Sequence, residues 1–263
     1  MSDFIQLSIE KTGVATVTFN NPENLNAFSP ECFDQLIATL DQLKADREVR
    51  AVIFTGSGQA FSAGGSYDFL REVTELSPVE TKEAVYARFA GGIKAVKLFP
   101  KPTVAAVNGP AAGAGCELAI ACDFRIVSAA AVFREVWVKI GVLCPLGGMF
   151  LLPRLVGLTK ATEMLMLGTK VGGEEAVSIG LANRLVEAEE LLPEATRWAE
   201  ELAQGAPLAL AAIKEGLLRG MDSTLESEWA RAVYAQSMLI SSNDCKEGID
   251  AMITKRKPQF TGT

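Results

Sequence analysis

The alternation of apolar and polar residues near the N-terminus predicts a β-hairpin. Residues 5–9 and 14–19 each place apolar side chains at every second position, and the Lys11-Thr12-Gly13 turn separates them. A period of two is typical of strands that have one solvated face. The continuously apolar runs at 51–55 and 103–107, each followed closely by glycine, instead predict buried strands.

Helical patterns alternate with these strands and then dominate the chain. Ser29-Pro30 predicts a helix that extends to about Lys44, because serine is a favoured N-cap and proline a favoured first residue. A polar, helix-prone stretch covers 66–98. Apolar residues at three- and four-residue spacing predict the later helices. Further helices are expected at 115–122, 159–167, 173–179, 189–204, 207–220, 224–241 and 245–255, and one more strand at 123–127.

The order of these elements predicts an α/β fold. Strands and helices that alternate through short loops favour stacked ββα units over a linear nucleotide-binding array. We assign residues 1–195 to this core and residues 196–263 to a helical C-terminal region.

Composition excludes several classes of protein. The net charge of −7 disfavours nucleic acid as a partner, because phosphate binding needs a basic surface. The sequence has no uninterrupted apolar stretch of about 18 residues, so no membrane-spanning helix is predicted. The N-terminus lacks the features of a signal peptide. The five cysteines are scattered without a CxxC pair. We therefore expect a cytoplasmic protein with no cysteine-based metal site and no membrane partner.

The chain of 263 residues contains no histidine. This absence excludes Ser-His-Asp and Cys-His nucleophile systems, histidine-ligated metals and a histidine general base. Proton transfer must therefore be carried out by carboxylates, cysteine, tyrosine or lysine.

Two glycine-rich segments carry little side-chain chemistry. They are Phe61-Ser62-Ala63-Gly64-Gly65-Ser66 and the run from Asn108 to Leu118. Small residues let a ligand approach the main chain, and amides at a helix N-terminus carry partial positive charge. Neither segment fits a Walker loop or a GxGxxG fingerprint. The two interpretations open at this point are tight turns and a site built from backbone amides.

Taken together, these segments and other short motifs give the sequence a resemblance to the enoyl-CoA hydratase/isomerase family, the crotonases. The motifs occur in the family's order along essentially the whole chain. They are Asn21-Pro22, Leu25-Asn26-Ala27-Phe28-Ser29, Phe61-Ser62-Ala63-Gly64, Lys101-Pro102, Ala105-Ala106-Val107-Asn108-Gly109, Gly113-Ala114-Gly115-Cys116-Glu117-Leu118-Ala119, Cys122-Asp123, Gly147-Gly148, Leu152-Pro153-Arg154, Gly180-Leu181 and Lys255-Arg256-Lys257-Pro258-Gln259-Phe260.

The resemblance implies a crotonase-like spiral of ββα repeats and a C-terminal trimerisation region, in a homotrimer or homohexamer. It also implies an acyl-CoA substrate, with coenzyme A as part of the substrate, no separate cofactor and no metal. In the family the thioester oxygen lies between two backbone N–H groups, which by position are those of Gly65 and Ala114. The substrate-binding positions carried over are Ala27, Ala63, Gly64, Ser66, Tyr67, Asp68, Gly113, Trp137 and Phe260.

Glu117 matches one of the two catalytic glutamates of the family's hydratases and is expected to act as acid and base. The position of the second glutamate is occupied by Trp137, and that of an aspartate used by other members by Pro145. Glu135 lies two residues before Trp137, and an extended segment could turn it to the same face. Its shifted register nevertheless predicts that its carboxylate does not reach the same atom. Cys144 would be a nucleophile only with a depressed pKa.

The leading hypothesis is an enoyl-CoA hydratase/isomerase-like enzyme that stabilises a thioester enolate. An acyl-CoA decarboxylase or hydrolase that uses the same amide pair is the alternative within catalysis. A weakly catalytic acyl-CoA-binding homologue, or an RNA-binding relative with basic residues at 254–257, is the alternative from another class.

Overall fold

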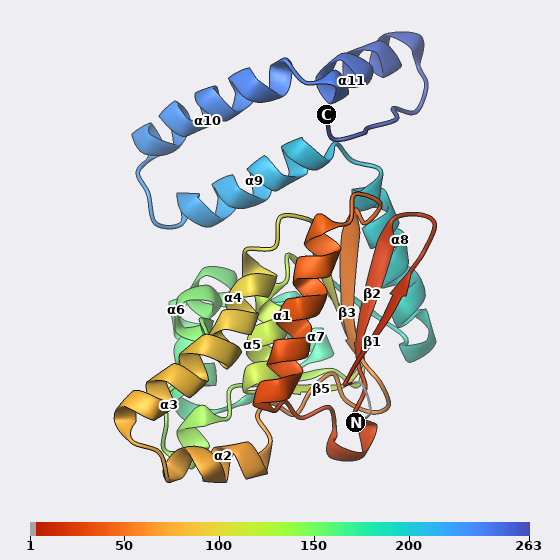
Figure 1. The fold of residues 1–263 in the computed structure, drawn as a ribbon. Helices are drawn as coiled ribbons and strands as arrows, with labels where there is room; N and C mark the ends of the chain where they lie inside the picture. The colour runs from red at the N-terminus through yellow and green to blue at the C-terminus, as the bar shows by residue number, and fades with distance from the viewer. Residues whose placement is uncertain (1–3) are drawn as a thin grey trace.

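The computed structural model describes residues 4–263 (Figure 1). The fold is built around a six-stranded sheet. The first two strands are antiparallel and confirm the predicted hairpin, and every later neighbour in this sheet pairs in parallel. In spatial order the strands are β1 (Ile5–Ile9), β2 (Val14–Phe19), β3 (Ala51–Gly56), β4 (Thr103–Val107), β6 (Phe124–Ser128) and β9 (Arg184–Val186).

A smaller, three-stranded sheet lies beside the first one. β5 (Pro110–Ala112) pairs in parallel with β7 (Val132–Arg134), which pairs antiparallel with β8 (Lys170–Gly172). These strands have three residues each, which is too short for a periodic signal, so the sequence pattern does not predict them. β5 and β7 lead directly into the segments that carry Ala114 and Glu135.

Helices cover both faces of the large sheet. The helices are α1 (Pro30–Ala45), α2 (Tyr67–Thr74), α3 (Pro78–Ala84), α4 (Gly91–Lys97), α5 (Ala114–Ala121), α6 (Gly148–Leu167), α7 (Gly173–Ser178), α8 (Leu191–Ala203), α9 (Pro207–Gly220), α10 (Leu225–Ile240) and α11 (Asn243–Thr254). Alternate residues of one strand face opposite sides: Phe54 belongs to a buried cluster that includes residues of α1, α4 and α5, whereas Ile53 belongs to a second cluster that includes residues of α8. The alternation therefore gives the sheet two apolar cores.

Helix α6 begins eleven residues before the predicted start at 159. Pro153 lies inside it and Gly157 has a non-helical φ of 75°, so a kink divides it into two parts. The sequence pattern detected only the part after the kink. The missed first part matters for the site, because its first residue, Gly148, contacts Glu117.

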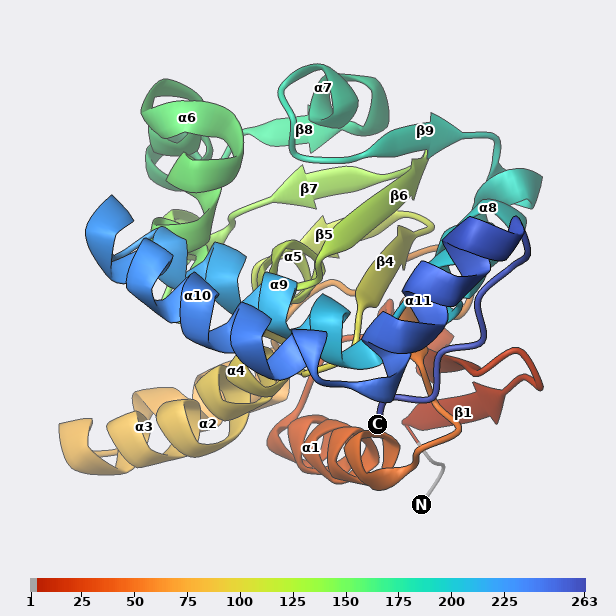
Figure 2. The ribbon, with the colours of Figure 1, turned by 90° about the horizontal axis from the view of Figure 1, so that it is seen from above.

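Helices α9, α10 and α11 form a separate layer at one end of the sheet (Figures 1 and 2). Polar contacts attach this layer to the core: Lys214 Nζ lies 2.7 Å from Asp123 Oδ2, and Arg50 donates to the carbonyl oxygens of Gly205 and Phe260 at 3.1 and 3.2 Å. Helix α8 packs on the large sheet and runs across residue 195, where the predicted core was taken to end.

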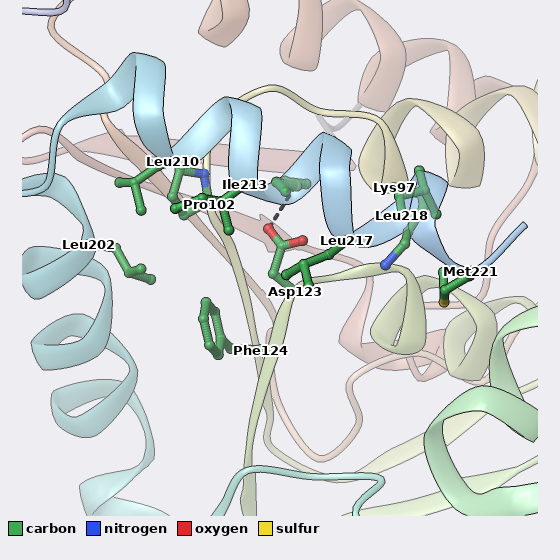
Figure 3. Close-up of a pocket in the computed structure, with 11 residues that line it drawn as sticks. Lys97, Pro102, Asp123, Phe124, Leu202, Leu210, Ile213, Leu217, Leu218 and Met221 are labelled. Carbon is green, nitrogen blue, oxygen red and sulfur yellow. Dashed lines mark hydrogen bonds and ion pairs between the residues drawn. The ribbon is translucent and has the colours of Figure 1, made fainter. Parts of the chain in front are cut away.

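A cavity of about 300 Å³ lies beneath α9, between that helix and the core (Figure 3). Leu210 and Ile213 of α9 line it together with Phe124, and Lys97 and Asp123 bring charge to its wall. None of the predicted site residues lines this cavity. Separately, none of the helices in residues 4–263 has both the length and the apolar composition needed to cross a bilayer.

Candidate active site

The two glycine-rich segments lie side by side. Ser62 and Ala111 form a parallel bridge, and the Ala112 N–H donates to the Ser62 carbonyl oxygen at 2.9 Å. The N–H groups of Phe61 and Ser62 both donate to the carbonyl oxygen of Pro110 at 3.1 Å. This backbone pairing brings Gly64 and Gly65 next to the start of α5.

Steric contact explains why two positions in these segments are glycine. Gly64 has a φ of +93°, and a Cβ atom added there would lie 2.5 Å from the Ala112 carbonyl oxygen and 3.3 Å from the Ala114 nitrogen. A Cβ atom on Gly115 would collide with the Ser62 carbonyl oxygen. The absence of side chains thus permits close contact between the two backbones.

The amide of Ala114 is at the first position of α5, where a helix leaves its N–H groups without intrahelical acceptors. The two neighbours of Gly65 in the chain are hydrogen-bonded to Phe28. The Phe28 N–H donates to the Gly64 carbonyl oxygen at 2.6 Å, and the Ser66 N–H donates to the Phe28 carbonyl oxygen at 2.7 Å. Within residues 4–263, no protein acceptor is recorded for the N–H of Gly65 or Ala114. Both are therefore available to an oxygen atom of a ligand.

Most of the other predicted binding residues surround this pair of amides. The Ala63 N–H donates to Leu25 at 2.9 Å, which brings the segment containing Ala27 next to the first glycine-rich segment. Ser66 caps α2 by accepting from the Phe69 N–H at 3.3 Å. Tyr67, with 81% of its surface exposed, and Asp68 follow on the outer turn of α2. Their roles in binding remain predictions.

Trp137 and Gly113 are in contact, whereas Phe260 lies elsewhere. A Cβ atom on Gly113 would lie 3.6 Å from ring atoms of Trp137, and the Gly113 φ of +49° favours glycine there. Phe260 instead lies against Gly248 of α11, in the C-terminal layer. The chain thus brings Gly113 and Trp137 to the amide pair and leaves Phe260 outside it.

Glu117 lies in the first turn of α5 and is completely buried. Its Oε2 accepts from the Gly148 N–H at 2.7 Å, and its Oε1 accepts from the Leu146 N–H at 3.4 Å. Burial raises the pKa of the Glu117 carboxyl, and the two N–H donors partly offset that rise. Because α5 places residues three apart on one face, Glu117 follows the Ala114 amide by one turn.

Glu135 also lies at this site, and whether its carboxylate reaches the atom expected of the second acid stays a prediction. Ligand atoms of Glu117, Glu135 and Cys144 lie within 4.8 Å of one another. Strand β7 ends at Arg134, and Val136 already has helical φ and ψ angles. Side chains beyond Arg134 therefore no longer alternate between two faces as they do in a strand. Neither carboxylate oxygen of Glu135 has a hydrogen-bond partner among the described residues. Burial and the neighbouring Glu117 charge raise the pKa of Glu135.

Two further side chains complete the surroundings of the carboxylates. The indole Nε1 of Trp137 is buried beside both of them without forming a hydrogen bond of good geometry to any described residue. Burial and the two nearby carboxylates raise the pKa of the Cys144 thiol. A raised pKa keeps this thiol protonated, which is the opposite of what a nucleophile requires.

In the described part of the chain, one group of side chains brings three potential metal-ligand atoms within 4.8 Å of one another. It consists of Glu117, Glu135 and Cys144. Two carboxylates and a thiol could ligate a cation, but a protonated thiol is a poor ligand. The predicted absence of a metal remains a prediction.

Known proteins resemble this chain in sequence and in fold. The profile of the enoyl-CoA hydratase/isomerase family matches residues 9–263. The 1,2-epoxyphenylacetyl-CoA isomerase of Escherichia coli is 35% identical over all of both chains. The short-chain-enoyl-CoA hydratase of Clostridium acetobutylicum is 34% identical over 95% of each chain. The crystal structure of enoyl-CoA hydratase from Bacillus anthracis superposes with a TM-score of 0.92 at 30% identity, covering 99% of this chain and all of the other.

The matches extend over sequence and fold alike. The expected α/β crotonase fold is confirmed by the superposed structures. The chain belongs to the enoyl-CoA hydratase/isomerase family.

Proposed function

We propose that this protein converts acyl-CoA thioesters through an enolate, which the amides of Gly65 and Ala114 stabilise while Glu117 moves the proton. The observation that carries the proposal is the pair of N–H groups without an acceptor, one helical turn from a buried glutamate with a raised pKa.

The backbone amides support the electrostatic part of this proposal. When a proton leaves the carbon next to a thioester, negative charge develops on the carbonyl oxygen. Donors that are already fixed in place need no reorganisation as this charge grows, and loss of one such donor typically costs about 2.7–4 kcal/mol of barrier. Pairing with the second glycine-rich segment, and the hydrogen bonds to Phe28, fix the position of Gly65.

The environment of Glu117 supports its role as acid and base. A carboxyl with a pKa near the working pH takes up and returns a proton most efficiently. Burial shifts the pKa of Glu117 in that direction, while the N–H groups of Leu146 and Gly148 keep the ionised form accessible.

We further propose that the protein is a homotrimer or homohexamer. Leu217, Met238 and Met252 each expose more than two-thirds of their surface on α9, α10 and α11. Large exposed apolar side chains are typical of surfaces that contact another protein.

A panel of thioesters in D₂O tests the reaction type. We expect the protein to convert a 2-enoyl-CoA to a product that has gained water, or a 3-enoyl-CoA to its 2-enoyl isomer, as measured by mass spectrometry and NMR. Loss of CO₂ from a malonyl-type thioester, without either of these reactions, would instead favour a decarboxylase. Release of free coenzyme A as the sole product would favour a hydrolase. Thioester binding without any conversion would contradict the proposed enzyme.

A further inference from the structure

The second buried glutamate has no partner that explains it. Glu135 is completely buried at the end of β7, and its two oxygens form no hydrogen bond within residues 4–263. No salt bridge between described residues includes Glu117 or Glu135. A buried carboxyl without a cation or a backbone donor is costly as an anion, so a neutral Glu135 is favoured.

The titratable groups around Glu135 are few. Cys116 and Glu117 approach it from α5, and Cys144 approaches from the segment before α6. Burial raises the pKa of both thiols, which leaves them neutral. The charge of the pair is therefore decided between the two carboxyl groups.

The hydrogen bonds decide which carboxyl holds the proton. Two carboxylates within 4.8 Å of each other in a dry pocket repel each other strongly, so they share one proton at neutral pH. Glu117 accepts two backbone N–H bonds that stabilise its anion, whereas Glu135 accepts no backbone N–H and has only the neutral side chains of Cys116, Trp137 and Cys144 beside it. The proton therefore resides on Glu135, and Glu117 is left free to act as a base.

We propose that Glu135, facing Glu117 without a partner of its own, is the second proton-transfer group of the site and acts on a 3-enoyl thioester. This inference rests on the proposed function and deepens it. Trp137 and Pro145 stand at the two positions where the family resemblance implies an acid. Glu135 supplies the missing acid from a neighbouring position of the chain.

The proton balance of the reaction closes within the pair. Glu117 removes a proton from C2, and the C–H electrons pass into a dienolate on the thioester oxygen. The O–H bond of Glu135 then breaks and its proton forms a new bond at C4, while the 2,3 double bond forms. Transfer of the proton from Glu117 to Glu135 restores the starting state, so the enzyme needs no oxidant, reductant or added proton.

Kinetics of Glu135→Gln on but-3-enoyl-CoA test this role. We expect kcat to fall about 100-fold or more, with the dissociation constant for the thioester nearly unchanged. The pH profile of the unsubstituted protein should fall at low pH, where Glu117 is protonated, and at high pH, where Glu135 loses its proton. The residual activity of the variant should keep only the fall at low pH. Glu135→Leu, which suits a dry pocket, replaces the glutamine variant if that one fails to fold.

Infrared spectroscopy provides a readout that does not depend on turnover. The difference spectrum between the unsubstituted protein and Glu135→Gln at pH 7 should show a protonated carboxyl band that shifts in D₂O. Glu163→Gln is the control, because Lys160 lowers the pKa of Glu163 and the same difference spectrum should lack that band.

The outcomes separate this inference from the proposed function. An inactive Glu117→Gln together with a fully active Glu135→Gln would overturn the role of Glu135 and leave the enolate mechanism standing. Full activity in both variants would overturn both. The absence of a protonated carboxyl band at pH 7 would also overturn the shared proton.

Discussion

Glu117→Gln is expected to lower kcat for acyl-CoA conversion by about 10²–10⁴-fold while the thioester still binds. Glutamine has nearly the shape of glutamate and can still accept from the Gly148 N–H through its amide oxygen. It cannot remove a proton, and Glu135 has no contact that would make it a base in place of Glu117. Steady-state kinetics and calorimetric titration with a non-reactive thioester measure the two effects separately.

Glu163→Gln on the exposed side of α6 is the matched control for this change. Glu163 pairs with Lys160 at 2.9 Å and lies outside the carboxylate pair, so its loss should leave kcat unchanged. If Glu117→Gln retained kcat within about threefold of the unsubstituted protein, Glu117 would not be the base.

Gly64→Ala is expected to have the second large effect, through the backbone. The new Cβ atom would meet the Ala112 carbonyl oxygen at 2.5 Å, and the φ of +93° is strained for alanine. The backbone of one of the two glycine-rich segments must move, which shifts the Gly65 amide relative to the Ala114 amide. Loss of one aligned donor predicts a decrease in kcat of about 10²–10³-fold. Strain at this position also predicts a decrease in unfolding free energy of about 1–3 kcal/mol.

Gly172→Ala provides the comparison for this backbone effect. A Cβ atom at Gly172 of β8 would meet nothing within 4 Å, so neither kcat nor unfolding free energy should change by much. Urea unfolding and steady-state kinetics on both variants give the two quantities. A Gly64→Ala variant with the same kcat as Gly172→Ala would show that the amide geometry does not govern the rate.

The sequence alone allowed two interpretations of the glycine-rich segments, tight turns or a site built from backbone amides, and the resemblance to the family pointed to Gly65 and Ala114. Small residues before the predicted helix at 115–122 indicated backbone chemistry, and the first helical amide lacks an acceptor in any helix. The contact between Gly64 and the Ala112 carbonyl could not be predicted. It depends on the pairing of Ser62 with Ala111, which are 49 positions apart in the chain.

The environment of Glu135 could not be predicted from the sequence. A register argument assumes that the strand continues, but β7 has three residues and the chain turns immediately after it. The lack of any backbone donor for Glu135 is likewise a property of packing between α5, β7 and the start of α6. The start of α6 was missed for a related reason, because Pro153 and Gly157 interrupt its helical pattern.

Exchange of the C2 protons of a saturated thioester tests for the enolate itself, because this exchange requires an enolate and no later step. Butanoyl-CoA is incubated with the protein in D₂O, and deuterium at C2 is followed by NMR. We expect exchange well above the buffer rate in the unsubstituted protein, and a rate near that of buffer in Gly64→Ala and Glu117→Gln. Exchange at the buffer rate in the unsubstituted protein, or undiminished exchange in both variants, would contradict enolate formation at the Gly65 and Ala114 amides.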